Sequence, residues 1–323
     1  MRKSPLTSTK DSGALQALVA AFSNEKRVKA GAVIITVFGD VILPRGGAVW
    51  LGSLIQLLGP LGLNERLVRT AAFRLVADEW LVPTAEGRRT NYGLSDTGRR
   101  RAEEAARHIY SPSAPQWDGQ WRLLTVPTDL PAGLKEALRR SLYWHGFGQL
   151  GANVFVHPSA EWRVVFDALT LEGFQHLLPG MLAFSALHPG AGLGGTNRDV
   201  VRTAWDLKQL GDDYDAFIKR YAPVADELTG PGGAAGVDPE TAFQVRVLLI
   251  HDFRRLLLRD PQLPEALLPT HWPGLRARAM CQAIYRQLWP ASESHLAGTL
   301  RLANGSELKV GAEVPANMAS WLL

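Results

Sequence analysis

The chain has 323 residues, enough to bury a large core and to divide into two or three domains, because single cores stop growing well below this length. Its 35 lysines and arginines exceed its 31 aspartates and glutamates only slightly, so net charge alone excludes little. The placement of charge says more: residues 1–110 carry 16 basic and 10 acidic residues, whereas the remainder carries 19 and 21. We therefore expect the first third to face a polyanion and the rest not to.

The single cysteine, Cys281, excludes an internal disulfide and fits a reducing cytoplasm, where we expect the protein to act. It is predicted to be a small core residue of a helix. The longest uncharged runs, residues 46–64 and 173–197, contain several glycines with Pro or His and do not resemble membrane spans, so no membrane partner is expected. Residues 1–28 read as a disordered Ser/Thr tail followed by a short helix over 14–22.

Residues 63–81 (LNERLVRTAAFRLVADEWL) combine an apolar stripe with a basic face. Asn64 can cap a helix with its side-chain carbonyl. At about 100° per residue, one face gathers Leu67, Val68, Ala71, Ala72, Leu75 and Val76. The opposite face holds Arg66, Arg69, Thr70, Phe73 and Ala77, with Arg74 at its edge. Such a face is often only solvated surface, so its neighbours must decide whether it binds nucleic acid.

Upstream of this helix, the pattern is that of a helix-turn-helix. Residues 32–43 and 48–58 read as apolar helices, and residues 59–63 (GPLGL) read as a tight turn. Three helices with a glycine-containing turn between the second and the third form this motif, whose last helix enters the DNA major groove. The motif explains why residues 63–81 keep opposed apolar and basic faces.

Downstream, the pattern is that of a basic hairpin. Residues 81–85 and 90–94 read as two strands around the turn Glu86-Gly87-Arg88-Arg89. Such a hairpin is the wing of a winged helix, and Arg88 and Arg89 at its tip would meet phosphates or the minor groove.

Together these parts predict a winged helix-turn-helix domain over residues 29–110 that binds double-stranded operator DNA. The ordered set of helices, turn and basic hairpin, in the part of the chain with the basic excess, is more specific than any one of its members. The predicted DNA contacts are Arg66, Arg69, Thr70, Phe73, Arg74, Arg88 and Arg89. Two interpretations of Phe73 stay open: it touches a thymine methyl group, or it packs under the wing.

The rest of the chain reads as two further domains after a Pro/Ser linker, SPSAP. A small α+β domain is predicted over residues 116–198, with strands at 122–127, 153–157 and 163–169 and a helix at 132–144. A helical domain for effector binding and dimerisation is predicted over 199–299, with helices at 199–221, 240–259 and 275–288. Residues 300–323 show no clear periodicity and are left unplaced.

Several separated stretches carry a family resemblance. They are FGDVILPRGG (38–47), LVRTAAFRLVADEWL (67–81), GRRTNYGLSDTGRRR (87–101), WDGQW (117–121), HDFRRLLLRDPQLP (251–264) and HWPG (271–274). In this order, over about residues 29–296, they resemble the PaaX family of phenylacetic acid degradation repressors.

The resemblance implies an α+β multidomain chain with an N-terminal winged helix-turn-helix, a ferredoxin-like middle domain similar to the Cas2 nucleases, and a helical C-terminal domain. It also implies a homodimeric repressor of an aromatic-acid catabolic operon, without catalytic activity or cofactor, released by phenylacetyl-CoA or a related acyl-CoA. A dimer suits a pseudo-palindromic operator, because one recognition helix reads only a few base pairs. We expect the helical C-terminal region to form the dimer surface.

Two motifs point to other chemistries. Residues 190–195 satisfy G-x-G-x-x-G, but they do not follow a clear buried strand, so a flexible interdomain loop is favoured over a dinucleotide site. Asp129 follows the first strand of the middle domain, near where Cas2-like nucleases carry a metal-binding aspartate. A metal-dependent nuclease is therefore the alternative function, and a turn residue is the simpler interpretation of Asp129. The histidines lack ligand spacing, so no metal site is predicted.

Residues 241–260 (TAFQVRVLLIHDFRRLLLRD) are apolar almost all round, which predicts a helix through the core of its domain. One polar stripe spans about 80° and holds Gln244, His251, Asp252, Arg255 and Arg259. Because buried charges must be paired, two interpretations stay open. The stripe is either an internal network, or an effector site in which His251, Arg255 and Arg259 take part and an arginine meets a phosphate of the acyl-CoA.

Overall fold

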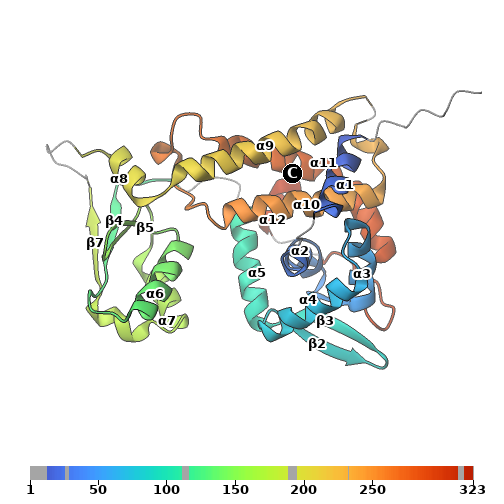
Figure 1. Cartoon of the computed structure of the whole chain (residues 1–323), viewed down its shortest axis with the longest axis horizontal. Helices are drawn as coiled ribbons and strands as arrows, with labels where there is room; N and C mark the ends of the chain where they lie inside the picture. Colours follow the sequence, from blue (N-terminus) through green and yellow to red (C-terminus); the bar gives the residue numbers. More distant parts are fainter. Residues whose placement is uncertain are drawn as a thin grey trace, which may run out of the picture. The chain divides into compact units, whose positions relative to one another are not determined.

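The computed structural model of the chain describes residues 13–25, 29–110, 116–187, 195–231, 233–311 and 316–322. The predicted disordered tail, the SPSAP linker and most of the glycine-rich stretch 190–195 lie outside the described residues. The chain divides into two compact units (Figure 1). The first unit contains Met1–Tyr110, Phe217–Phe253 and Arg278–Leu323, and the second contains Ser111–Ala216 and Arg254–Ala277. The domain boundaries expected from the sequence stay predictions.

The N-terminal part of the first unit alternates short helices with a small sheet. Its elements are α1 (Ala14–Ser23), α2 (Ala30–Val37), η1 (Phe38–Ile42), η2 (Leu43–Arg45), β1 (Ala48–Trp50), α3 (Leu51–Leu58), η3 (Gly59–Leu61), α4 (Glu65–Ala77), β2 (Leu81–Glu86), β3 (Arg89–Leu94) and α5 (Asp96–Ile109). The three strands pair antiparallel in the order β1-β3-β2. Figure 1 shows the hairpin of β2 and β3 projecting from the helices of this unit.

One predicted helix begins later than expected. Residues 48–50 are not helical but form β1, since they pair antiparallel with residues 91–93 of β3, and α3 starts only at Leu51. The apolar pattern did not separate the two because Val49 is buried in a strand and Leu51 and Leu54 are buried in a helix.

The C-terminal part of the first unit supplies its most deeply buried helix. Residues 242–250 of α10 (Pro239–Leu257) are buried on every side, as expected for a helix through the core. Cys281 in α11 (Pro273–Thr299) is fully buried, as predicted. The unplaced tail also has a position, since α12 (Ala316–Leu322) brings Trp321 to 1% exposure. The ring of Trp321 lies 5.1 Å from that of Tyr110, centroid to centroid.

The second unit contains a four-stranded antiparallel sheet in the order β5-β6-β4-β7. Along the chain its elements are β4 (Trp121–Thr125), α6 (Ala132–Trp144), β5 (Gly148–Gly151), β6 (Val154–His157), α7 (Trp162–Leu171), η4 (Gln175–Gly180), β7 (Leu182–Ala186) and α8 (Asn197–Ala204). The succession β-α-β-β-α-β with this strand order is the ferredoxin-like topology that the resemblance implies. A core that includes Leu124, Leu142, Phe155 and Leu169 stabilises it.

The third strand predicted for this domain is wrong. Residues 163–169 belong to α7, because Val165 and Leu169, four residues apart, are 6% and 0% exposed while Val164 is 62% exposed. This is the spacing of a helix face, which the β-branched residues concealed.

The long helix predicted over residues 199–221 is divided in two. Trp205 adopts an extended backbone, with φ −134° and ψ 139°, so α8 ends at Ala204 and α9 (Leu207–Thr229) begins after it. The Trp205 ring stacks on that of Trp121, with centroids 6.3 Å apart. Two further short 3-10 helices are η5 (Ala234–Gly236) and η6 (Glu265–Leu267).

Candidate nucleic-acid interface

Helix α4 begins and packs much as its sequence predicts. The Asn64 side-chain oxygen accepts a hydrogen bond from the Leu67 backbone N–H at 3.0 Å, which satisfies one of the unpaired donors at the helix start. The buried side of the helix consists of Val68, Ala71, Ala72 and Leu75. Leu67 is an exception at 45% exposure, because the buried stripe begins one residue later.

The other side of α4 is exposed, as expected, and carries Arg66, Arg69, Thr70, Phe73, Arg74 and Ala77. Phe73 is 74% exposed, so its ring does not pack under the hairpin, which removes one of the two interpretations left open. Arg69 forms an exposed ion pair with Glu65, its neighbour one turn earlier, at 2.7 Å. The face therefore offers guanidinium groups and one aromatic ring to the solvent.

The hairpin of β2 and β3 closes through a two-residue turn, Gly87-Arg88, since Glu86 pairs with Arg89 across it. Gly87 has a φ of +60°, which glycine adopts without steric cost and which a type II′ turn needs at its first central position. Arg88 lies in the turn and is exposed. Arg89 closes the four-residue turn Glu86-Gly87-Arg88-Arg89 and is also the first residue of β3.

The side chain of Arg89 is engaged within the first unit. Its Nη1 donates a hydrogen bond to the Ala303 carbonyl at 3.1 Å. Its guanidinium carbon lies 4.6 Å from the ring centroid of Trp50. Both arginines are exposed, but Arg89 makes these two contacts, whereas Arg88 lies in the turn, although the sequence motif treats the two alike.

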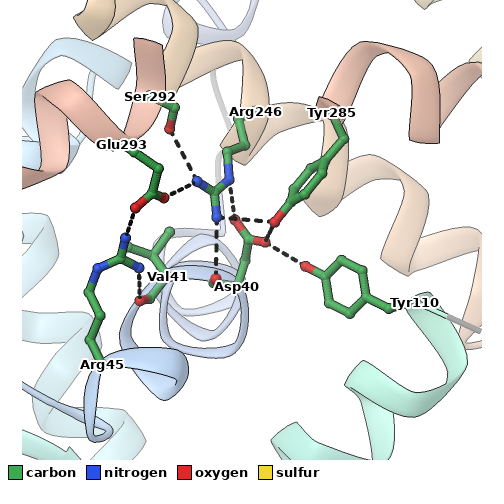
Figure 2. A network of polar contacts seen from close by, with 8 residues as sticks. All are labelled: Asp40, Val41, Arg45, Tyr110, Arg246, Tyr285, Ser292 and Glu293. Carbon is green, nitrogen blue, oxygen red and sulfur yellow. Dashed lines mark hydrogen bonds and ion pairs between the residues drawn. The ribbon is translucent and has the colours of Figure 1, made fainter. Parts of the chain in front are cut away.

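A buried polar network lies away from this surface, in the core of the first unit (Figure 2). Arg246 is 0% exposed and donates from Nε to Asp40 at 2.9 Å and from Nη1 to Glu293 at 2.7 Å. Asp40 also accepts hydrogen bonds from the hydroxyls of Tyr110 and Tyr285. The network therefore joins η1 and the end of α5 to α10 and α11.

The same network satisfies a second buried arginine and its own tyrosines. Arg45 forms an ion pair with Glu293 and donates to the Val41 carbonyl at 2.6 Å. Burial, followed by the nearby negative charge of Asp40, raises the pKa of Tyr110 well above its ordinary value, so its hydroxyl stays protonated and can donate. Burial alone would lower the pKa of Arg246, but Asp40, Tyr285 and Glu293 outweigh it and raise that pKa.

Sequence reasoning missed this network, although a signal for it was present. Asp40 is the only charged residue between positions 30 and 44, and Arg246 is the only one between 241 and 250. Two lone charges of opposite sign, each inside a long apolar helix pattern, are candidates for a buried pair because an unpaired buried charge is strongly unfavourable.

The residues of the polar stripe expected on α10 lie in unlike environments. His251 is buried, 6% exposed, and its Nδ1 lies 3.1 Å from the Thr36 hydroxyl. Arg255 and Arg259 are exposed, so the expectation of a stripe buried along its whole length is wrong. Arg259 lies beyond the end of the helix, where it forms an ion pair with Asp213 at 2.8 Å.

Asp129 lies exposed in the turn between β4 and α6. Within the described parts of the chain, no three His, Cys, Asp or Glu side chains gather where they could hold a metal ion. The nuclease alternative thus gains no support from the geometry. None of the helices in the described ranges is long and apolar enough to cross a bilayer.

The chain is thus a multidomain α+β protein. Its candidate nucleic-acid surface is an exposed basic helix face beside an antiparallel hairpin with a basic turn. Three family models match the chain in order: PaaX-like protein over residues 29–98, PaaX protein central Cas2-like domain over 114–180, and PaaX-like protein C-terminal domain over 205–298. The chain belongs to the family of PaaX-like proteins, and the resemblance drawn from its motifs is confirmed.

Similar proteins include one curated relative and one solved structure. The chain is 38% identical over 276 residues to the transcriptional repressor PaaX of Escherichia coli (strain K12), which covers 83% of each chain. The uncharacterized protein Rv0674 from Mycobacterium tuberculosis aligns with a TM-score of 0.47 and 24% identity, over 75% of this chain and 89% of that one.

Proposed function

We propose that the chain is a DNA-binding transcriptional repressor without catalytic activity, and that α2, α3, α4 and the β2–β3 hairpin form a winged helix-turn-helix. The observation that carries the proposal is the exposed face of α4, where arginines stand around a phenylalanine that is 74% exposed. A single exposed ring is common on protein surfaces, so the arginines around it, in the part of the chain with the basic excess, are what favour a nucleic-acid partner. The repressor relative, identical at 38% of positions, supports the same function.

The chemistry of the face suits duplex DNA. Arginine can donate two hydrogen bonds to guanine in the major groove, and an apolar ring can contact a thymine methyl group. We assign these roles to Arg66, Arg69, Arg74 and Phe73, with Thr70 as a further polar contact. In the wing, Arg88 meets phosphate or the minor groove.

The repressor acts in the cytoplasm as a homodimer on a pseudo-palindromic operator. A single recognition helix reads only a few base pairs, so two copies related by a twofold axis raise specificity steeply. The operator controls a catabolic operon for aromatic acids, in keeping with the family. A protein that remains monomeric in sedimentation, both alone and with operator DNA, would contradict this part of the proposal.

The effector is phenylacetyl-CoA or a related acyl-CoA, and Arg255 is the residue that we assign to its phosphate contact. Arg255 is exposed on the last turn of α10, whereas His251 is buried against Thr36 and Arg259 already pairs with Asp213. An exposed guanidinium can form two parallel hydrogen bonds with a phosphate. The variant Arg255→Ala should still bind operator and should lose its response to the ester, and normal release would move the site elsewhere.

The proposal is tested by mobility shift of the wild-type protein on promoter DNA from its own gene neighbourhood. We expect a complex that survives excess unrelated DNA and dissociates when the acyl-CoA ester is added. Equal affinity for promoter and unrelated DNA would contradict sequence-specific repression. Incubation with Mg²⁺ and labelled DNA or RNA should leave both intact, and cleavage that is lost in Asp129→Ala would favour the nuclease alternative.

A further inference from the structure

Residues 300–311 follow the last stretch matched by a family model, and within them Arg301 and Ala303 form hydrogen bonds with the small sheet of the first unit. The Arg301 carbonyl accepts a hydrogen bond from the Trp50 backbone N–H in β1 at 3.0 Å. The backbone N–H of Ala303 donates to the Asn91 side-chain oxygen in β3 at 2.7 Å. Leu300 and Ala303 are buried, at 0% and 5% exposure. We call residues 300–311 the bracing segment.

The bracing segment reaches the middle strand of the sheet. Asn91 lies in β3, opposite Trp50 of β1 on one side and opposite Thr84 of β2 on the other. Its amide nitrogen donates to Glu86 at 2.9 Å, at the end of β2. One side chain therefore ties the bracing segment to both strands of the hairpin.

Arg89 makes the second tie. Its Nη1 donates to the Ala303 carbonyl and its guanidinium stacks over Trp50, so both polar groups of the Ala303 peptide backbone are held by side chains of β3. Arg88 and Arg89 are both exposed, but among the residues that the structure describes nothing comparable restrains Arg88 in the turn. A two-stranded hairpin is only marginally stable by itself. The ties at Arg89 and Asn91 lie near the turn, where β1 pairs with β3 no further than Asn91, so they affect how well the tip is held.

We infer that the bracing segment positions the wing for DNA, that Arg89 and Asn91 are positioning residues, and that Arg88 makes the phosphate contact of this pair of arginines. The inference rests on the proposed function, and it concerns how the wing is held in position at the proposed DNA-binding site. A hairpin that is ordered before it binds loses less conformational entropy on forming the complex, so the braces raise affinity without touching DNA.

Two measurements on the full-length protein test this inference. The first is hydrogen exchange of peptides from β2 and β3 in the absence of DNA. The second is the slope of log affinity against log salt concentration on promoter DNA, which changes by about 0.9 for each phosphate that the protein ceases to neutralise. The first reports the bracing alone, and the second separates direct binding of phosphate from positioning.

Arg88→Gln and Arg89→Gln form a matched pair, because each removes one positive charge from adjacent residues. We expect Arg88→Gln to flatten the slope by about 0.9 per bound wing and to leave exchange in the free wing unchanged. We expect Arg89→Gln to speed exchange in the wing and to lower affinity with little change in slope. If Arg89→Gln flattens the slope as Arg88→Gln does and leaves exchange unchanged, Arg89 binds DNA directly and the inference is wrong.

At Asn91, the loss of two hydrogen bonds can be compared with their restoration in a second variant. Asn91→Ala removes the acceptor for Ala303 and should lower affinity about fivefold, the equivalent of one hydrogen bond. The double variant Glu86→Gln with Asn91→Asp keeps the net charge and an acceptor for the Ala303 backbone N–H, and it exchanges donor and acceptor only in the hydrogen bond between positions 86 and 91. It should restore affinity and slow exchange. A double variant no better than Asn91→Ala would overturn the inference.

Failure of the two proposals gives different results. If the wild-type protein does not bind promoter DNA, the proposed function fails, while exchange in the free wing still decides whether residues 300–311 brace it. If the wild-type protein binds and the Arg89 and Asn91 variants leave wing exchange unchanged, the bracing fails and the proposed function stands.

Discussion

Two ion pairs of similar length occupy opposite environments in the first unit. Arg246 lies 2.9 Å from Asp40, and the two side chains are 0% and 1% exposed. Arg69 lies 2.7 Å from Glu65, and those side chains are 56% and 61% exposed. The distances are nearly equal, so burial decides what each pair does.

The buried pair is tied to the fold and the exposed pair is available to a partner. Buried charges need further hydrogen-bond partners, and Asp40 bonds to Tyr110 and Tyr285 while Arg246 bonds to Glu293. Removing either member of the pair would leave an uncompensated buried charge. An exposed pair is screened by water and contributes little to stability. Arg69 can therefore exchange Glu65 for a base or a phosphate at small cost, whereas Arg246 cannot leave Asp40.

The largest effect is expected from breaking the buried pair. Arg246→Met should reduce the free energy of unfolding by about 3 to 5 kcal/mol, because Asp40 and Glu293 lose their shared cation. Chemical unfolding followed by circular dichroism measures the loss. Arg246→Lys, which keeps the charge but not the planar fork, serves as the control and should lose less. A loss below about 1 kcal/mol in the methionine variant would contradict the contrast drawn above.

A partly buried histidine, His157, sharpens the comparison in the second unit. Burial, then the charges of Arg122 and His145, lower the pKa of His157 from its ordinary value of 6.5 to about 4. Because the folded pKa is the lower one, the stabilisation is complete above pH 6.5 and is lost as the pH falls through 4. The full loss is about 3 kcal/mol.

Unfolding of the wild-type protein at a series of pH values between about 7 and 4 measures this dependence. The control is His157→Asn, which keeps an acceptor for the Ser159 backbone N–H and does not titrate. The variant should flatten the dependence in this interval. Equal pH profiles for the two proteins would show that His157 does not carry it.

The smallest effect is expected from the exposed pair. Glu65→Gln should change the free energy of unfolding by less than about 0.5 kcal/mol, since Glu65 and Arg69 are both more than half exposed. DNA affinity should rise, because Arg69 loses a competitor for phosphate and the surface loses a negative charge. The gain should shrink as salt is added. A fall in affinity, measured by fluorescence anisotropy, would mean that Glu65 holds Arg69 in its binding position.

Local patterns predicted the helix with the candidate site well. The period of α4 and the cap at Asn64 follow from neighbouring residues alone, and so does the Gly87 turn. Patterns failed where distant contacts decide. Residues 48–50 become a strand because β3 lies beside them, and residues 163–169 become a helix although their β-branched residues favour a strand.

The position of side chains in three dimensions was equally beyond local patterns. Arg88 and Arg89 look equivalent in the sequence, but Ala303, more than 200 residues later, holds only Arg89. Asp40 and Arg246 are likewise joined across 206 positions of the chain. A single sequence contains the members of such pairs but not their pairing.

The most direct test of the central claim compares the wild-type protein with the triple variant Arg66→Ala, Arg69→Ala and Arg74→Ala on promoter DNA. Operator affinity should fall at least about a hundredfold, since a base-reading arginine contributes about 1 to 3 kcal/mol, and the salt dependence should become flatter. The free energy of unfolding should change little, because all three side chains are exposed on α4. A triple variant that folds and binds its operator with unchanged affinity and unchanged salt dependence would contradict the assignment of α4 as the recognition helix.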